Sequence, residues 1–82
     1  MNYEKMIGLR VKKLREEKGL TTTALAGMVD LSQAQISRLE NAKQGFRSAT
    51  LVRIAEALGV KPAYFWIEDE AEAARLGGPS KT

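Results

Sequence analysis

The sequence predicts an all-α fold, a five-helix bundle that forms a single domain. Apolar residues recur every three or four positions along most of the chain, and no segment shows the strict alternation typical of a β-strand. Residues that favour helix starts and helix ends separate these segments. The 82 residues are enough for one domain at most. A core of this size is stable only when it is well packed or when the chain dimerises.

The first helix is expected over residues 4–18. Ile7, Val11 and Leu14 recur at helical spacing and form one apolar stripe, while charged side chains fill the other faces. Gly19 follows the last turn, and glycine readily adopts the left-handed conformation that ends many helices.

The second helix is expected to begin after Thr21, because a threonine hydroxyl can cap a first turn. Its buried positions would be Leu25, Ala26 and Val29. Asp30 then stands where the chain must bend, and aspartate tolerates the left-handed region better than most residues do. The spacing therefore predicts two short helices joined by a tight turn.

The third helix is expected from Ser32 to Asn41. Ser32 and Gln35 match the S-x-x-Q capping box, in which each side chain accepts a hydrogen bond from the other residue's backbone. At about 100° per residue, Ile36 and Leu39 share one side of this helix. The opposite side carries mostly polar groups: Gln33, Ala34, Ser37, Arg38 and Asn41.

This polar side of the third helix holds groups that can read DNA bases. Glutamine can pair with adenine, arginine with guanine, and an alanine methyl can contact the methyl group of thymine. A solvated surface has the same composition, so the residues alone leave both interpretations open.

A basic loop is expected over residues 42–47. Ser48 is expected to cap a fourth helix that ends at Leu58, since Gly59 follows it. Pro62 suits the first position of a short fifth helix.

Charge divides the chain into two parts. Residues 1–66 carry eleven Lys and Arg against six Asp and Glu, whereas residues 67–82 carry two basic against four acidic side chains. We expect a folded domain over residues 1–67 and an acidic, flexible tail over residues 68–82. A basic body suits a surface that binds a polyanion, although many soluble domains share this balance.

The composition excludes several classes of function. The chain has no cysteine and no histidine, so it cannot form disulfides, the common zinc sites, or a site with a histidine base or cysteine nucleophile. Its carboxylates are better explained as solvated or paired, and we expect no enzyme activity, metal or cofactor. The N-terminus does not resemble a signal peptide, and no apolar run approaches the ~20 residues of a membrane span. A cytoplasmic protein without a membrane partner is expected.

Several segments together resemble one known family. They are RVKKLR at residues 10–15, GLT at 19–21, LA at 25–26, ISRLEN at 36–41 and LVRIAEALGV at 51–60. With this spacing, residues 7–66 resemble the helix-turn-helix domain of the lambdoid phage repressor and Cro class, the Xre-like regulators. The resemblance implies a bundle of five helices whose third helix enters the major groove of double-stranded DNA.

The resemblance also implies roles for particular residues. The base contacts would come from Gln33, Ala34, Ser37 and Arg38. The phosphate contacts would come from Thr22, Asn41, Lys43, Arg47 and the backbone of Ser48. Arg10 on the first helix is a further phosphate candidate. The family commonly has glutamine where this chain has Thr22, but a hydroxyl at a helix N-terminus can still meet a phosphate.

Two further expectations concern structure. Arg15 and Glu40 match positions that pair in the family, and such a pair would fix the orientation of the third helix. Tyr64, Trp66 and Ile67 belong to an aromatic cluster that would be partly exposed and would form the contact of a homodimer. A dimer would place its recognition helices roughly 34 Å apart, to meet successive major grooves.

Three functions stay open at this level. A sequence-specific transcriptional regulator, most simply a repressor, fits the resemblance best. An antitoxin or restriction-modification controller of the same fold would act with a separate protein or toxin partner. A protein-interaction module could keep the fold without binding DNA.

Overall fold

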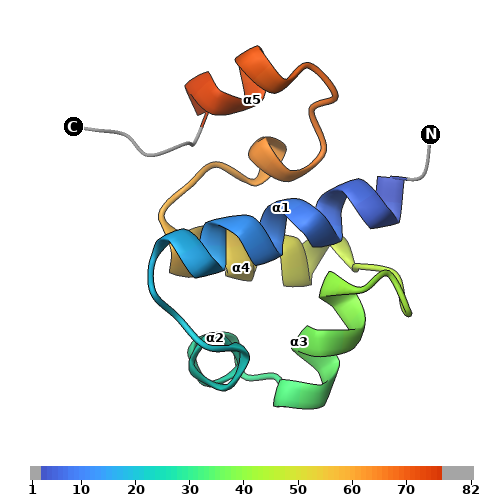
Figure 1. Ribbon diagram of the computed structural model, residues 1–82, viewed down its shortest axis with the longest axis vertical. Helices are drawn as coiled ribbons and strands as arrows, with labels where there is room; N and C mark the ends of the chain where they lie inside the picture. Colours follow the sequence, from blue (N-terminus) through green and yellow to red (C-terminus); the bar gives the residue numbers. More distant parts are fainter. Residues whose placement is uncertain (1–2, 77–82) are drawn as a thin grey trace.

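The helix α1 (Tyr3–Glu17) lies across the middle of the molecule, and the other elements pack around it (Figure 1). The computed structural model describes residues 3–76. α2 (Thr22–Val29) and α3 (Gln33–Glu40) lie on one side of α1, the short 3-10 helix η1 (Pro62–Phe65) and α5 (Glu70–Leu76) lie on the other, and α4 (Ser48–Leu58) crosses behind. All described elements are helical, which confirms the all-α fold. None of the helices in residues 3–76 has the length and apolar character needed to span a bilayer.

The turns and caps of the first three helices lie where the sequence predicts them. Gly19 and Asp30 adopt left-handed conformations, with φ of 72° and 60°. Thr21 accepts a hydrogen bond of 3.0 Å from the backbone of α2. Ser32 and Gln35 form both bonds of the capping box, at 3.1 and 2.9 Å. Local side-chain chemistry therefore sets the tight turn between α2 and α3.

The core is one continuous apolar cluster to which every described element contributes. Phe65 of η1 and Ile36 of α3 are completely buried, and so are Leu25 of α2 and Ile54 of α4. Ala26 is 3% exposed at the α2–α3 contact, where a small side chain lets the two helices approach closely. The core thus fixes α3 against the body of the protein.

The start of α4 differs from the prediction. Ser48 is the first helical residue and Arg47 occupies the N-cap position, with extended backbone angles and no side-chain capping bond. The helix begins one residue earlier than expected, so the Ser48 hydroxyl does not stand at the cap. The first backbone N–H groups of α4 consequently lack a side-chain acceptor.

The C-terminal part also differs. Residues 62–65 form a single 3-10 turn, and the fifth α-helix covers residues 70–76, which the sequence assigns to the acidic tail. Asp69 caps this helix by accepting a bond of 2.9 Å from the backbone of Ala71, and Ala73 is 3% exposed in the core. Residues 77–82 lie outside the described residues. The domain boundary at residue 67 stays a prediction, but residues 70–76 pack as part of the body.

Gly8 allows α1 and α3 to pack closely together. A Cβ atom on Gly8 would lie 2.6 Å from the carbonyl oxygen of Glu40 and 2.7 Å from that of Leu39. Glycine inside a helix costs about 1 kcal/mol relative to alanine, so its presence here has a packing reason. The sequence prediction did not single out this residue, which brings the C-terminus of α3 against α1.

Candidate nucleic-acid interface

The outer face of α3 is polar, as predicted, and its inner face is buried. Ile36 is completely buried and Leu39 is 3% exposed. Of the four predicted base contacts, three are exposed and the last is half-buried: Gln33, Ala34, Arg38 and Ser37. The helix therefore presents an amide, a methyl group, a guanidinium and a hydroxyl on one accessible surface.

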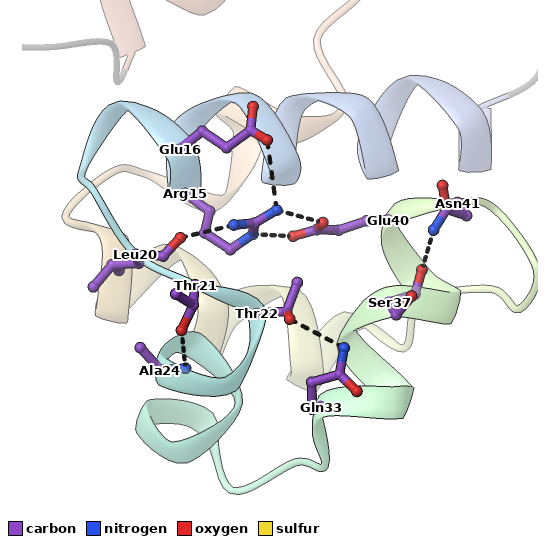
Figure 2. A network of polar contacts seen from close by, with 10 residues as sticks. All are labelled: Arg15, Glu16, Leu20, Thr21, Thr22, Ala24, Gln33, Ser37, Glu40 and Asn41. Atoms are coloured by element: carbon purple, nitrogen blue, oxygen red, sulfur yellow. Dashed lines mark hydrogen bonds and ion pairs between the residues drawn. The ribbon is translucent and has the colours of Figure 1, made fainter.

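The first of these groups, Gln33, is held by α2. Its Nε2 donates a hydrogen bond of 3.1 Å to Oγ1 of Thr22, so the starts of α2 and α3 are joined, as Figure 2 shows. The amide keeps one N–H and its carbonyl oxygen for another partner. This is the pair of groups that a glutamine uses on adenine. Thr22, expected only at a phosphate, thus also orients Gln33.

The loop after α3 folds back over Arg38. The backbone N–H of Lys43 donates to the carbonyl oxygen of Arg38 at 2.8 Å, and Nε of Arg38 donates to Oε1 of Gln44 at 2.9 Å. Ala42 makes this turn possible by adopting a left-handed conformation with φ of 58°. The sequence prediction missed Gln44, since only the turn at Ala42 brings it to Arg38.

Arg15 and Glu40 form the predicted pair, and both are buried, at 7% and 5% exposure. Nε of Arg15 donates to Oε2 of Glu40 at 2.6 Å, and Nη2 donates to Oε1 at 3.0 Å. Nη1 donates to the carbonyl oxygen of Leu20 at 2.7 Å (Figure 2). The hydrogen bond to Glu40 raises the pKa of Arg15. This two-pronged contact fixes the end of α3 relative to α1 and the α1–α2 turn.

Arg10, predicted to contact phosphate, is used inside the protein. Its Nη1 donates to the carbonyl oxygen of Tyr64 at 2.8 Å and to that of Ile67, and its guanidinium lies 6.0 Å from the centre of the Tyr64 ring. These partners lie in and just after η1, across α1 from α3 (Figure 1). Backbone carbonyl oxygens therefore already engage the charge of Arg10, and its contact with a DNA phosphate stays a prediction.

The remaining phosphate candidates lie at one end of α3. Lys43, Arg47 and Ser48 are exposed in the loop and at the start of α4. Asn41 is exposed as well, and its Nδ2 donates to the carbonyl oxygen of Ser37 at 2.8 Å. Its amide oxygen points away from that bond (Figure 2). The loop thus places two cations and the amide groups of a helix start beside the outer face of α3.

The expected exposed cluster near residue 65 is reduced to a single aromatic side chain. Tyr64 is 9% exposed and packs edge-on against Phe65, with ring centres 5.3 Å apart. Burial raises the pKa of Tyr64. Ile67 is partly buried against the core, whereas Trp66 is 40% exposed. Tyr64 is in the core because it closes the space between α1 and η1, so a dimer contact here would centre on Trp66.

The chain is similar to known helix-turn-helix proteins over most of its described length. The helix-turn-helix family model HTH_3 matches residues 11–65. The HTH-type transcriptional regulator RamB of Mycobacterium tuberculosis is 34% identical over 64 residues, which cover 78% of this chain and 14% of RamB. The chain therefore spans only a small part of the length of this relative.

Solved structures have the same arrangement of helices. The clp gene regulator ClgR from Corynebacterium glutamicum superposes with a TM-score of 0.79 and 27% identity, covering 92% of this chain and 80% of that chain. The P22 c2 repressor, in a complex with a synthetic operator, superposes with a TM-score of 0.73 and 26% identity, covering 78% of this chain and 97% of that chain. Residues 11–65, which the family model matches, contain α2, α3 and α4.

Proposed function

The chain belongs to the helix-turn-helix family HTH_3, and from this membership we propose that it is a sequence-specific transcriptional regulator that binds double-stranded DNA. The observation that carries the proposal is the outer face of α3, which is accessible and held from both ends. Thr22 orients its start, and the buried Arg15–Glu40 pair fixes its end. A helix held in this way can present its side chains to base edges in fixed positions.

In the proposed complex, α3 lies in the major groove. The free N–H and carbonyl oxygen of Gln33 suit adenine, and the methyl group of Ala34 suits the methyl group of thymine. Arg38 keeps its two Nη groups for guanine, since only Nε bonds to Gln44. Ser37 contributes a hydroxyl that can donate or accept. Together these four residues would set the sequence that the protein reads.

Phosphates would be held on both sides of α3. Thr22 stands at the start of α2, where free backbone N–H groups favour an anion. Asn41, Lys43 and Arg47 and the backbone of Ser48 would hold the other side. These contacts would supply affinity and register, and base contacts would supply sequence preference.

We further propose that the protein acts as a homodimer and as a repressor. The homodimer is supported by Trp66, which offers an exposed aromatic surface outside the proposed DNA face. The repressor role is supported by one of the similar structures, the P22 c2 protein, which is named a repressor. A dimer would place its recognition helices roughly 34 Å apart and read two half-sites. The relatives named here are regulators, so we expect no enzyme activity, and binding to the chromosome would place the protein in the cytoplasm.

Selection of bound duplexes from a random DNA pool tests the proposal. We expect enrichment of a sequence with twofold symmetry and half-sites about one helical turn apart. Arg38→Ala should relax preference at one base pair, at a cost of about 1–3 kcal/mol. Lys43→Ala should weaken binding to selected and random duplexes equally and lower the salt dependence.

Three results would contradict parts of this proposal. A wild-type protein that shows no salt-dependent affinity for any duplex would favour a protein-interaction module. Enrichment of no sequence, with both variants alike on random and selected DNA, would exclude sequence-specific reading. A Trp66→Ala variant with unchanged self-association would exclude the dimer contact at this residue.

A further inference from the structure

A cleft of about 330 Å³ lies between α3, the loop after it and the first half of α4. Its lining is mostly polar and carries hydrogen-bond donors and positive charge. The lining residues are Leu31, Gln35, Leu39, Gln44, Gly45, Arg47, Thr50 and Arg53. None of these described lining residues is a carboxylate, so a bound anion would meet no repelling negative charge from them.

The two arginines of this cleft are uncommitted. Within residues 3–76, the side chains of Arg47 and Arg53 form no hydrogen bond or ion pair. By contrast, Arg10, Arg15 and Arg38 each donate to a defined protein oxygen. A guanidinium pair without protein partners, beside amide and hydroxyl groups, suits a phosphate.

The cleft borders the outer face of α3 on the side away from α2. Gln44, in its wall, accepts the hydrogen bond of 2.9 Å from Arg38. Gln35 is the next side chain around α3, roughly 60° beyond Arg38 at about 100° per residue. On the other edge of the same face, Gln33 bonds to Thr22 at the start of α2. The outer face of α3 is therefore flanked by the start of α2 on one edge and by this cleft on the other.

A helix in the major groove has a sugar-phosphate strand along each edge, because the groove is only about 12 Å wide. The start of α2 faces one strand in the proposed complex. The other strand then passes the mouth of the cleft. A second cleft, between α1 and α5, does not suit an anion in this way, since Glu17 and Glu70 balance Arg10 and Lys13 in its lining.

We propose that the cleft between α3 and α4 binds a backbone phosphate of this second strand, with Arg53 as a ligand that the loop residues alone do not supply. Arg47 stands at the loop end of the cleft and Arg53 one and a half turns along α4, so the two guanidinium groups approach from different elements. The Thr50 hydroxyl lies on the same side of α4 and adds a neutral donor. This inference rests on the proposed function.

Arg53→Gln tests the site through the salt dependence of duplex binding. Loss of one phosphate contact lowers the magnitude of the slope of log affinity against log salt by about 0.9. The loss of affinity between 0.1 M and 1 M salt should therefore be about eightfold smaller in the variant than in the wild type. We expect this smaller slope on selected and random duplexes alike. Arg53→Lys should keep the slope, because it keeps the charge. Arg75→Gln, an exposed arginine on α5, is the matched control and should change nothing. Thermal unfolding of each variant checks that the fold is intact.

A duplex with single neutral methylphosphonates locates the phosphate. At one position of the duplex, the methylphosphonate should weaken DNA binding by the wild type and leave DNA binding by Arg53→Gln unchanged, since that variant no longer uses this phosphate. If Arg53→Gln keeps the wild-type affinity and slope, or responds to every methylphosphonate as the wild type does, the inference is overturned and the proposed function stands. A wild-type protein that binds no duplex would overturn both.

Discussion

Two arginines hold the two sides of α1 in different ways. Towards α3, Arg15 meets a buried carboxylate, Glu40, with contacts of 2.6 and 3.0 Å. Towards η1, Arg10 meets no carboxylate of residues 3–76 within ion-pair distance and instead donates to the carbonyl oxygens of Tyr64 and Ile67. The α3 side thus depends on two opposite charges, each of which needs the other, and the η1 side on one charge and neutral acceptors.

The difference has an energetic consequence. A buried charge that loses its partner is left in a poorly solvating environment, and this costs far more than the pair contributes by itself. A half-buried carbonyl that loses a donor can turn to water. We therefore expect that replacing either partner of the buried pair removes most of the stabilisation between α1 and α3, which carries the proposed DNA face. The attachment of η1 and α5 should weaken gradually.

The largest effect should come from breaking the buried pair. Arg15 is 7% exposed in the structure, and Glu40→Ala leaves it only the exposed carboxylate of Glu16, 3.9 Å away, so we expect a loss of about 3–5 kcal/mol in the free energy of unfolding. Urea denaturation measures it. The double variant Arg15→Met with Glu40→Leu should recover most of the loss, because no charge stays buried. A double variant no more stable than Glu40→Ala would show that packing, and not charge, dominates this side.

The next effect concerns the close contact on the same side of α1. Gly8→Ala places a Cβ atom 2.6 Å from the carbonyl oxygen of Glu40, so α1 and α3 must separate. The better helix propensity of alanine returns about 1 kcal/mol, and overpacking costs about 1–3 kcal/mol. We expect a net destabilisation of about 1 kcal/mol and weaker DNA binding, measured on the same samples. Gly27→Ala is the control, since nothing lies within 4 Å of its added Cβ. Equal stability of both variants would contradict the close approach.

The contacts of Arg10 with η1 give a smaller effect of a different kind. Arg10→Met removes two hydrogen bonds to carbonyl oxygens, which we expect to cost about 1–2 kcal/mol in stability. The salt slope of DNA binding should not change, because the guanidinium faces η1. Lys43→Met is the converse control, with a lower slope and unchanged stability. A lower slope for Arg10→Met would instead support the phosphate contact predicted for Arg10 from the sequence.

The same contrast explains what the sequence could predict. Thr21, Ser32, Gly19 and Asp30 act on neighbours within four residues, so their chemistry is visible in a short window of sequence. The Arg15–Glu40 pair spans 25 residues, but the family resemblance supplied it. Local chemistry and resemblance together predicted the all-α fold and the outer face of α3.

The features that were missed depend on contacts between distant segments. Gly8 matters only because α3 ends against it, and Arg10 finds its carbonyl acceptors 54 and 57 residues away. The helix α5 has a weak apolar pattern, and its buried residue is a single alanine, Ala73. Gln44 reaches Arg38 only through a left-handed alanine, which no propensity favours. Neither backbone acceptors nor strained turns leave a pattern of residue types.

The smallest effect tests the η1 side through pH. Burial, with the negative charge of Glu17, raises the pKa of Tyr64 above its ordinary value of 10.0. The folded state therefore favours the neutral phenol, and its contribution to stability is complete below pH 10 and is lost as the pH rises through the folded-state pKa. Tyr64→Phe keeps the ring contact with Phe65 and removes the proton. Between pH 8 and pH 11, the free energy of unfolding should fall less in Tyr64→Phe than in the wild type, as followed by urea denaturation. Parallel pH profiles of the two proteins would mean that Tyr64 ionises as easily in the folded chain as in the unfolded one. The burial of Tyr64 in η1 would then be less complete than the burial of Arg15 against α3.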